Sequence, residues 1–308
     1  MYVNGDLTIR GILKGDVWVG YVANNKATAS GGGVFIGAGT ALIEDTFVYL
    51  NEANTPDPLG MGLASTALGG GVFVGNQVAT ATINRTKINN NLSTGTGGGV
   101  HIQDGGEGNG ASVTLDHCPI YGNKARSMGA GVAVMKGTLN VVSSNIHHND
   151  VEGNTTGWGG GVYVGERVTA ASFFNSTIAA NSAVTSGGGV WIEVPATGIN
   201  PAITLDNTWV VGNTAAEQGG GIAVAWAEAG GSVALVLKGN TLIAHNTLTG
   251  IGSAGGGLYL GRGSLTLDGA TFDTNEADWG DGVFAATGTQ WFMGPGGVSY
   301  IDDIWYDE

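Results

Sequence analysis

The sequence predicts an all-β fold, a single-stranded, right-handed parallel β-helix (solenoid) of about nine to ten coils. Two observations carry this prediction: a glycine cluster recurs nine times among the 308 residues, and an asparagine recurs at a matching place in most repeats. The clusters start 25 to 38 residues apart, which is the self-similarity of a solenoid and not of a globular domain. They begin at Gly31, Gly69, Gly97, Gly129, Gly159, Gly187, Gly219, Gly255 and Gly280.

Each glycine cluster opens a six-residue motif whose second half reads as a β-strand. The fourth and sixth residues are almost always branched aliphatic, as in Val34 and Ile36, whereas the fifth varies freely. Alternation with a period of two predicts a strand with an aliphatic face turned inward and a variable face turned outward. The fifth residues are Phe35, Phe73, His101, Ala133, Tyr163, Trp191, Ala223, Tyr259 and Phe284.

The recurring asparagine marks a second strand in each repeat. Three residues before it stands an apolar residue, and five residues before it usually a small one, as with Ile120 and Cys118 ahead of Asn123. Strands that recur in one orientation, with no helical period between them, pair with their own copies one coil away. The stacked asparagines then form a structural ladder that satisfies a buried turn. Its members are Asn25, Asn51, Asn91, Asn123, Asn149, Asn181, Asn213, Asn246 and Asn275.

The repeats leave no domain boundary, so we expect residues 1–308 to form a single β-helix domain. Residues 1–30 are predicted to form the first coil and an N-terminal cap, with Val17, Val19 and Val22 starting the core. Residues 31–285 supply the repeat coils, and the aromatic-rich residues 286–308 a C-terminal cap or assembly segment. Insertions at 52–68, 104–110 and 193–201 are predicted to be loops that leave the rod.

Composition excludes several classes of partner. The formal net charge of −14 opposes binding to polyanions, because nucleic-acid affinity rests on basic residues that neutralise phosphates. We therefore expect no nucleic-acid partner. The single Cys118 rules out an internal disulfide framework, and no spacing of Cys and His suggests a metal site. No cofactor is predicted.

The N-terminus lacks the pattern of a secretory signal, and no apolar stretch approaches the length of a membrane span. We therefore expect no transmembrane segment. The chain reads as a mature or excised segment of an extracellular or cell-surface protein.

The two motifs together resemble a known repeat. A Gly-Gly-small-aliphatic tetrapeptide that alternates with Phe-x-x-Asn is the signature of the polymorphic outer-membrane-protein repeat of bacterial surface proteins. The tetrapeptide appears here as GGGV or GGGI, and the second motif as Phe272-Asp273-Thr274-Asn275, or with Ile or Val in the first place elsewhere. The resemblance spans nearly the whole chain and implies surface display, adhesion or a passive scaffold.

Parallel β-helices also house polysaccharide lyases and hydrolases, which need facing carboxylates or acidic calcium ligands. Asp116, Asp206 and Asp268 share a position in the repeat, but the sequence places Val142, Phe174 and Gly239 among their neighbours there. No such cluster of acids emerges. The five histidines do not repeat in a cluster either, so no catalytic residue and no metal ligand is predicted.

An outward aromatic stripe is the candidate ligand-binding surface. Aromatic side chains along a flat sheet can stack on sugar rings or dock a protein, although they also stabilise one another as cross-strand pairs. The position four residues before each asparagine, which includes Phe47, Lys87 and Trp209, lacks the regular threonine array of an ice-binding face. The candidate residues are Phe35, Phe73, Tyr163, Trp191, Tyr259 and Phe284.

The sequence therefore favours a non-enzymatic, extracellular β-helix scaffold, adhesin-like or fibre-forming. The alternative is a β-helix that binds or degrades polysaccharide through the aromatic stripe. The expected partners are a glycan or host-surface ligand, or further copies of the chain in a homo-oligomer or head-to-tail fibre, because the open ends of a β-helix expose unpaired strand edges.

Overall fold

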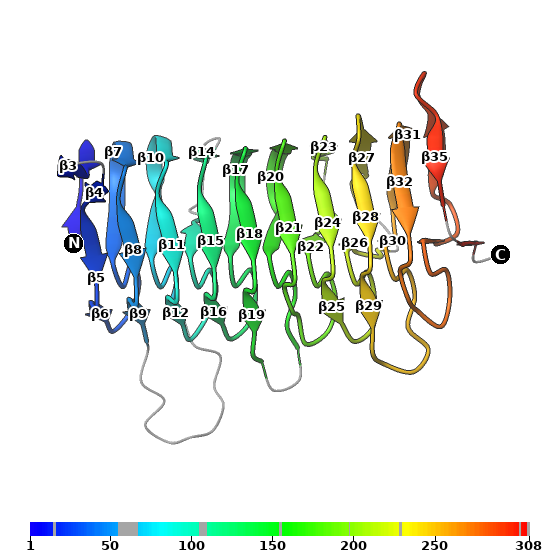
Figure 1. Ribbon diagram of the computed structural model, residues 1–308, viewed down its shortest axis with the longest axis horizontal. Coiled ribbons are helices and arrows are strands. Elements are labelled where there is room, and N and C mark those ends of the chain that lie inside the picture. Colours follow the sequence, from blue (N-terminus) through cyan, green and yellow to red (C-terminus); the bar gives the residue numbers. More distant parts are fainter. Residues whose placement is uncertain are drawn as a thin grey trace.

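A computed structural model describes residues 1–14, 17–54, 67–104, 110–153, 156–196, 198–227, 230–301 and 303–306, without the side chains of residues 13–19 and 299. The described residues contain no helix, and all strand pairs except the antiparallel β3–β4 pair are parallel. The sheets extend along the long axis of the molecule, and their strands lie across it (Figure 1). The two termini lie at opposite ends of this stack (Figure 1). Such an arrangement fits a parallel β-helix; the right hand and the number of coils stay predictions.

The first sheet contains the strands that follow the glycine clusters, together with the stretch of chain after them. Strands of one repeat pair in register with those of the next, so that Val72, Val100 and Val132 lie side by side. Its strands are β1 (Tyr2–Val3), β2 (Leu7–Arg10), β7 (Val34–Glu44), β10 (Val72–Asn84), β13 (Val100–Ile102), β14 (Ser112–Asp116), β17 (Val132–Val142), β20 (Val162–Phe174), β22 (Val190–Ile192), β23 (Ala202–Asp206), β26 (Ile222–Val224), β27 (Val233–Lys238), β30 (Leu258–Leu260), β31 (Gly263–Asp268), β33 (Val283–Ala285), β34 (Gln290–Met293) and β36 (Ile304–Tyr306).

The second sheet holds the strands that precede the asparagines, and a third set of two-residue strands follows them. The second sheet comprises β5 (Tyr21–Ala23), β8 (Phe47–Tyr49), β11 (Lys87–Asn89), β15 (Pro119–Tyr121), β18 (Asn145–His147), β21 (Thr177–Ala179), β24 (Trp209–Val211), β28 (Leu242–Ala244), β32 (Ala270–Asp273) and β35 (Val298–Tyr300). The short strands are β6 (Lys26–Ala27), β9 (Glu52–Ala53), β12 (Leu92–Ser93), β16 (Lys124–Ala125), β19 (Asp150–Val151), β25 (Thr214–Ala215) and β29 (Thr247–Leu248).

The core lies between the sheets and consists of the inward-facing residues of all repeats. Val34, Ile36, Val100 and Ile102 are fully buried, as the alternation predicts, and so is Ile120 of the second strand. The core begins earlier than expected, because Leu7 already belongs to it. The side chains of Val17 and Val19 lie outside the described ones. Their strand β4 (Val17–Val19) pairs with β3 (Ile12–Lys14) in an antiparallel hairpin.

The C-terminal segment does not simply cover the last repeat. Strands β34, β35 and β36 pair in parallel with β31, β32 and β33, so these three strands continue the stack for one further turn. The predicted insertions at 52–68 and 104–110 fall largely outside the described residues.

The asparagines form one continuous hydrogen-bonded ladder from Asn25 to Asn275. Asn149 shows the pattern: its Nδ2 donates to Asn181 Oδ1 (2.9 Å) and to the carbonyl of Ile120 (3.0 Å). Its Oδ1 accepts hydrogen bonds from the backbone N–H (3.1 Å) and Nδ2 (2.9 Å) of Asn123. Each interior amide therefore uses both of its donors and both acceptor sites inside the protein.

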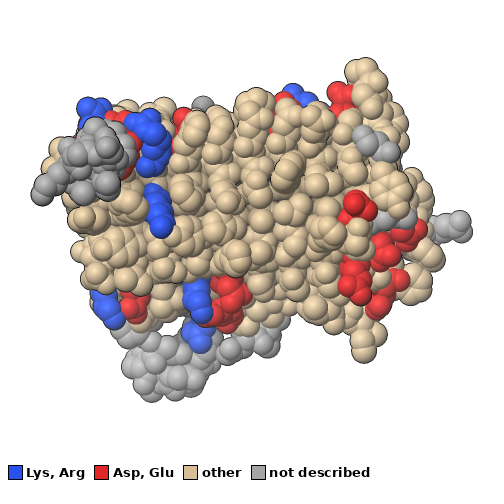
Figure 2. Space-filling model, in the orientation of Figure 1, with Lys and Arg blue, Asp and Glu red and all other residues tan. Residues whose placement is uncertain are grey.

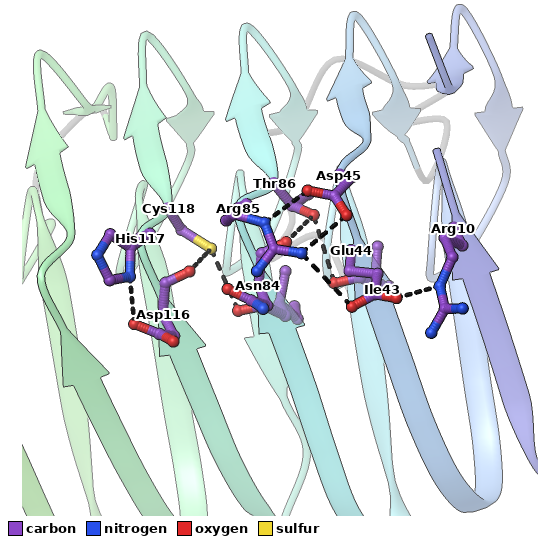
Figure 3. A network of polar contacts seen from close by, with 11 residues as sticks. Arg10, Ile43, Glu44, Asp45, Asn84, Arg85, Thr86, Asp116, His117 and Cys118 are labelled. Carbon is purple, nitrogen blue, oxygen red and sulfur yellow. Dashed lines mark hydrogen bonds and ion pairs between the residues drawn. The ribbon is translucent and has the colours of Figure 1, made fainter. Parts of the chain in front are cut away.

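A second row, of small polar residues, runs parallel to the ladder. It lies at the corner between the first two sheets, before the strands of the second sheet, whereas the ladder follows these strands. Cys118 belongs to this row, and its Sγ donates to the carbonyls of Ile83 (3.2 Å) and Asp116 (3.3 Å), as Figure 3 shows. Ser144 Oγ, one repeat further on, accepts from the Cys118 N–H. Burial raises the pKa of the Cys118 thiol to about 12. The thiol therefore stays protonated at neutral pH and acts as a donor.

Besides the first glycine of each cluster, two corners of most repeats carry a residue with positive φ. At the corner before the asparagine ladder this position is Gly122 (φ 62°) or Gly212 (φ 63°) in two repeats but Ala180 (φ 50°) in another. A left-handed backbone costs a non-glycine residue roughly 1–2 kcal/mol. Replacing Ala180 by glycine is therefore expected to stabilise the protein by about 0.5–1 kcal/mol, measured by denaturant unfolding.

Ala179→Gly is the matched control for that substitution. Ala179 lies one residue earlier, in β21, and its φ is not positive. Glycine there only adds freedom to the unfolded chain, so we expect a loss of about 0.5–1 kcal/mol. Destabilisation by both substitutions to a similar extent would show that the corner is not strained.

Candidate functional site

The fifth residues of the motifs form a stacked aromatic row along the first sheet. Phe35 stacks on Phe73 with ring centroids 4.6 Å apart, and Phe73 on His101 at 5.6 Å. Tyr259 stacks on Phe284 at 5.3 Å. The structure thus places the members of the predicted stripe in register, interrupted by Ala133 and Ala223.

The expectation that this row faces solvent on a flat sheet is wrong for most of its length. Phe73, Tyr163, Trp191 and Tyr259 expose only 5–7% of their surface, and Phe35 and Phe284 are half-buried. The row points away from the aliphatic core but lies beneath another part of the chain. Substituting Tyr163 or Trp191 would therefore damage packing and not an open surface.

The glycine clusters explain this burial. The first glycine of each cluster has a positive φ, between 57° and 72°, which bends the preceding residue over the row. Thr96 Oγ1 lies 2.8 Å from His101 Nδ1, and the rings of Trp158 and Trp191 are 6.1 Å apart. The residues that cover the row pair with one another from repeat to repeat. They are Ser30, Leu68, Thr96, Met128, Trp158, Ser186, Gln218, Ala254 and Trp279.

His101 is the histidine of this row. Its Nε2 also lies 3.1 Å from Gln103 Oε1, so a neutral ring can donate to Gln103 and accept from Thr96. Complete burial lowers the pKa of His101 to about 4. The ring is therefore neutral at physiological pH.

This pKa makes folding pH-dependent in a defined window. Between about pH 6.5 and 4 the unfolded chain binds a proton at His101 that the folded protein does not, so stability falls as pH falls. The loss amounts to roughly 3 kcal/mol by pH 4. We expect His101→Phe, which extends the stack of Phe73, to flatten this part of the stability profile measured by urea unfolding.

His245→Asn is the control, because His245 is exposed and asparagine tolerates its positive φ of 54°. The control is expected to keep the pH dependence of the wild type. If wild type and His101→Phe show the same dependence of stability on pH, then His101 binds its proton equally well in the folded and the unfolded protein.

The covering layer opens near the C-terminal end. Ala254 is one of the small residues of the covering row, and it stands between Gln218 and Trp279. An open pocket of about 510 Å³ lies at this place. Its lining includes Gln218, Trp226, Gly252, Ala254, Tyr259, Trp279, Phe284, Ala286 and Trp305, which we call the C-terminal aromatic pocket.

The aromatic rings of this pocket form a floor and walls. Tyr259 and Phe284 continue the stacked row, and Trp305 is the next member of that row in register. The rings of Trp279 and Trp305 are 4.9 Å apart at an angle of 59°. Trp226, Trp279 and Trp305 expose 56%, 45% and 43% of their surface, respectively. Here, and not in the middle of the stripe, aromatic faces are open to a ligand.

Sequence reasoning missed the three tryptophans. Each of them falls outside the fifth positions of the nine motifs, because Trp226 follows strand β26, Trp279 precedes a glycine and Trp305 lies beyond the last repeat. The only signal available was the density of tryptophan in the last third of the chain.

The acidic side chains near the pocket accept hydrogen bonds from backbone N–H groups. Asp278 Oδ2 accepts from the N–H of Gly252 (2.5 Å), and Asp281 Oδ1 from that of Ala277 (2.8 Å). The lining named above contains no carboxylate and no histidine. In the part of the chain that the structure describes, no three His, Cys, Asp or Glu side chains are grouped to hold a metal ion.

Several acids elsewhere are engaged in ion pairs. Arg85 makes two hydrogen bonds to the buried Asp45, at 2.6 and 2.8 Å, and Arg10 pairs with Glu44 of the same corner (Figure 3). The strand register also corrects one sequence assignment. Lys238, and not Gly239, lies between Asp206 and Asp268, and its Nζ is 3.1 Å from Asp206 Oδ2.

The comparisons with known proteins give a structural likeness but no family. No family model matches the chain, so the resemblance to the polymorphic outer-membrane-protein repeat gains no support, and no curated protein matches it. Among solved structures the chain is similar to that of the Dettilon tailspike protein (gp208), at 15% identity and a TM-score of 0.41. The likeness covers 99% of this chain and 61% of the tailspike. In the described residues no helix has the length and apolarity needed to cross a membrane.

Proposed function

We propose that the protein is a non-enzymatic, extracellular or cell-surface scaffold, a right-handed parallel β-helix of about nine to ten coils that binds carbohydrate in an adhesin-like manner. The observation that carries this proposal is the C-terminal aromatic pocket. Three half-open tryptophans and the stacked pair Tyr259 and Phe284 offer flat apolar faces, and the Gln218 amide offers hydrogen bonds. Sugar rings present C–H faces that stack on aromatic rings, and hydroxyls that an amide can bind.

Binding without cleavage follows from the same lining. Glycoside hydrolysis requires two carboxylates on opposite sides of the scissile bond, about 5–10 Å apart. The pocket supplies aromatic faces and an amide instead, and the nearby Asp278 and Asp281 accept backbone hydrogen bonds. Bound oligosaccharide is therefore expected to be recovered intact after long incubation.

A glycan array followed by calorimetry tests the proposal. Wild type is expected to bind neutral glycans, and Trp279→Ala to weaken binding about tenfold, since a lost aromatic face is worth roughly 1 kcal/mol or more. Phe174→Ala removes another exposed aromatic ring, 42% open and outside the pocket, and is expected to change nothing. The proposal fails if wild type binds no neutral glycan, or if both variants bind alike.

Self-assembly is a second candidate, favoured by the last strands. Phe292, Met293, Tyr300 and Tyr306 each expose more than half of their surface, at the end where β34–β36 close the stack. Strand edges at the end of a stack invite pairing with another copy. Sedimentation velocity over a range of concentrations checks this: growth that Phe292→Lys abolishes supports a head-to-tail fibre, and a single species at all concentrations excludes it.

A further inference from the structure

A second aromatic pocket lies at the opposite end of the molecule, on the second sheet. Its lining residues are Tyr21, Phe47, Tyr49, Lys87 and Asn89, which enclose about 290 Å³ and form what we call the Lys87 pocket. They come from the neighbouring strands β5, β8 and β11, whose pairings place Phe47 between Tyr21 and Lys87. The site therefore involves a different sheet and different repeats from those of the C-terminal aromatic pocket.

Two aromatic faces hold the Lys87 ammonium. Its Nζ lies 4.9 Å from the ring centroid of Tyr121 and 5.9 Å from that of Phe47. Both distances are within the range of a cation–π interaction. Among the described residues the ammonium has neither an ion pair nor a hydrogen bond, so its three N–H donors are open to a ligand. Most other described basic side chains are paired with acids, namely Arg10, Lys26, Arg85, Lys124, Lys136, Arg167 and Lys238.

Asn89 adds an unpartnered amide to the same pocket. Only 9% of its surface is exposed, and its side chain makes no hydrogen bond within the described part of the chain. Asn89 is not among the described residues with a fully buried, unpaired polar atom, so its amide is open to the pocket and to solvent. A ligand that bears both donors and acceptors would supply the missing hydrogen bonds. The hydroxyls of a sugar have both.

The charge around this pocket differs from that of the rest of the molecule. Residues 1–140 hold 8 of the 11 basic and 9 of the 25 acidic residues, a net charge of −1, against −13 for residues 141–308. Figure 2 shows acidic side chains along the edges and toward the C-terminal end, whereas the middle of the N-terminal third carries a basic side chain and no acidic one. The overall charge of −14 therefore does not repel an anion from this place at physiological salt, which screens charges beyond about 8 Å.

We propose that the Lys87 pocket binds a carboxylate-bearing sugar, a uronate residue of an acidic polysaccharide. The ammonium of Lys87 would pair with the carboxylate, which is the charge-assisted contact that the protein itself does not supply. Tyr21 and Phe47 offer faces for the sugar ring, and Asn89 binds its hydroxyls. A neutral sugar would leave the ammonium without its anion, so this site and the C-terminal aromatic pocket select different parts of a glycan.

Calorimetry with short oligogalacturonates tests the assignment on the full chain. Wild type is expected to bind them, and more weakly as ionic strength rises. Lys87→Met keeps the aliphatic stem but not the charge and is expected to lower the affinity about tenfold or more. Lys87→Arg is expected to retain binding. Arg126→Gln makes the same change in net charge at a half-buried residue that directly follows β16 of another sheet, and it is expected to have no effect.

Two further binding measurements test the need for the carboxylate and distinguish this pocket from the C-terminal aromatic pocket. The carboxyl-reduced form of the same oligosaccharide keeps the ring and loses the charge, and it is expected to bind poorly. Trp279→Ala is expected to bind oligogalacturonate as wild type does, so failure of the C-terminal aromatic pocket and failure of this site are told apart. The assignment is overturned if wild type does not bind oligogalacturonate, if Lys87→Met binds it unchanged, or if the reduced form binds equally well.

Discussion

Asn149→Ala is expected to lower the free energy of unfolding by roughly 3–5 kcal/mol, because each buried group left without its hydrogen bond costs about 1–3 kcal/mol. Asn149 is fully buried in the middle of the ladder. Its removal withdraws the acceptor of two Asn123 donors, and it also deprives Asn181 Oδ1 and the Ile120 carbonyl of a donor. Denaturant unfolding followed by circular dichroism measures the loss as a lower midpoint.

Asn25→Ala is the matched control, since Asn25 is the exposed first member of the same ladder. Its Nδ2 donates to Asn51 Oδ1 (2.8 Å), but no earlier asparagine contacts it among the described residues, and water reaches its amide. The expected cost is about 1 kcal/mol, the net worth of an ordinary hydrogen bond. Similar losses for Asn25→Ala and Asn149→Ala would show that the ladder contributes no more inside the stack than at its end.

The strands and the ladder were predictable because both depend on residues that recur at one place in the repeat. A period of two assigns Val100 and Ile102 to one face of a strand, and the structure buries both completely. Asn123 recurs beside equivalent asparagines, and stacking repeats at a strand spacing of about 4.8 Å brings equal residues into contact. In such a fold the residues that recur in the sequence are also the residues that contact one another, so the structure of one repeat predicts that of the others.

The sites were not predictable in the same way, because they lie where the repeats differ. A period of two says that Trp191 faces away from Val190 and Ile192, but not that Trp158 covers it. The C-terminal aromatic pocket lies where the covering residue is Ala254. That local exception has no meaning until Gln218, Ala254 and Trp279 are known to be neighbours.

The Lys87 pocket shows the same limit. In the sequence Lys87 is one member of an irregular outward row. Its significance comes from two aromatic rings in the adjacent strands β8 and β15, and from the absence of a carboxylate partner among the described residues. Both facts are properties of side chains brought together across repeats, and neither repeats itself along the chain.

The glycines at the third place of each cluster are expected to be the least replaceable residues of the fold, and Gly99→Ala tests this. A Cβ at Gly99 would lie 2.5 Å from the carbonyl oxygen of Gly131 in the next repeat and 3.1 Å from Asn123 Nδ2. That carbonyl already accepts from the N–H of Val100 at 3.0 Å, so it cannot move away without breaking the pairing of the repeats. We expect a loss of about 3 kcal/mol or more, or a failure to fold.

Gly212→Ala separates this steric effect from the loss of glycine as such. Gly212 has a positive φ of 63°, yet nothing lies within 4 Å of a Cβ built there, and the preceding repeat carries Ala180 at the same corner. Alanine at 212 is therefore expected to cost only about 1–2 kcal/mol, the penalty of a left-handed residue. Denaturant midpoints and soluble yield of the two variants, measured side by side, decide the matter. If Gly99→Ala folds as well as Gly212→Ala, then the spacing of the repeats can expand, and the triple glycine serves only to turn the chain.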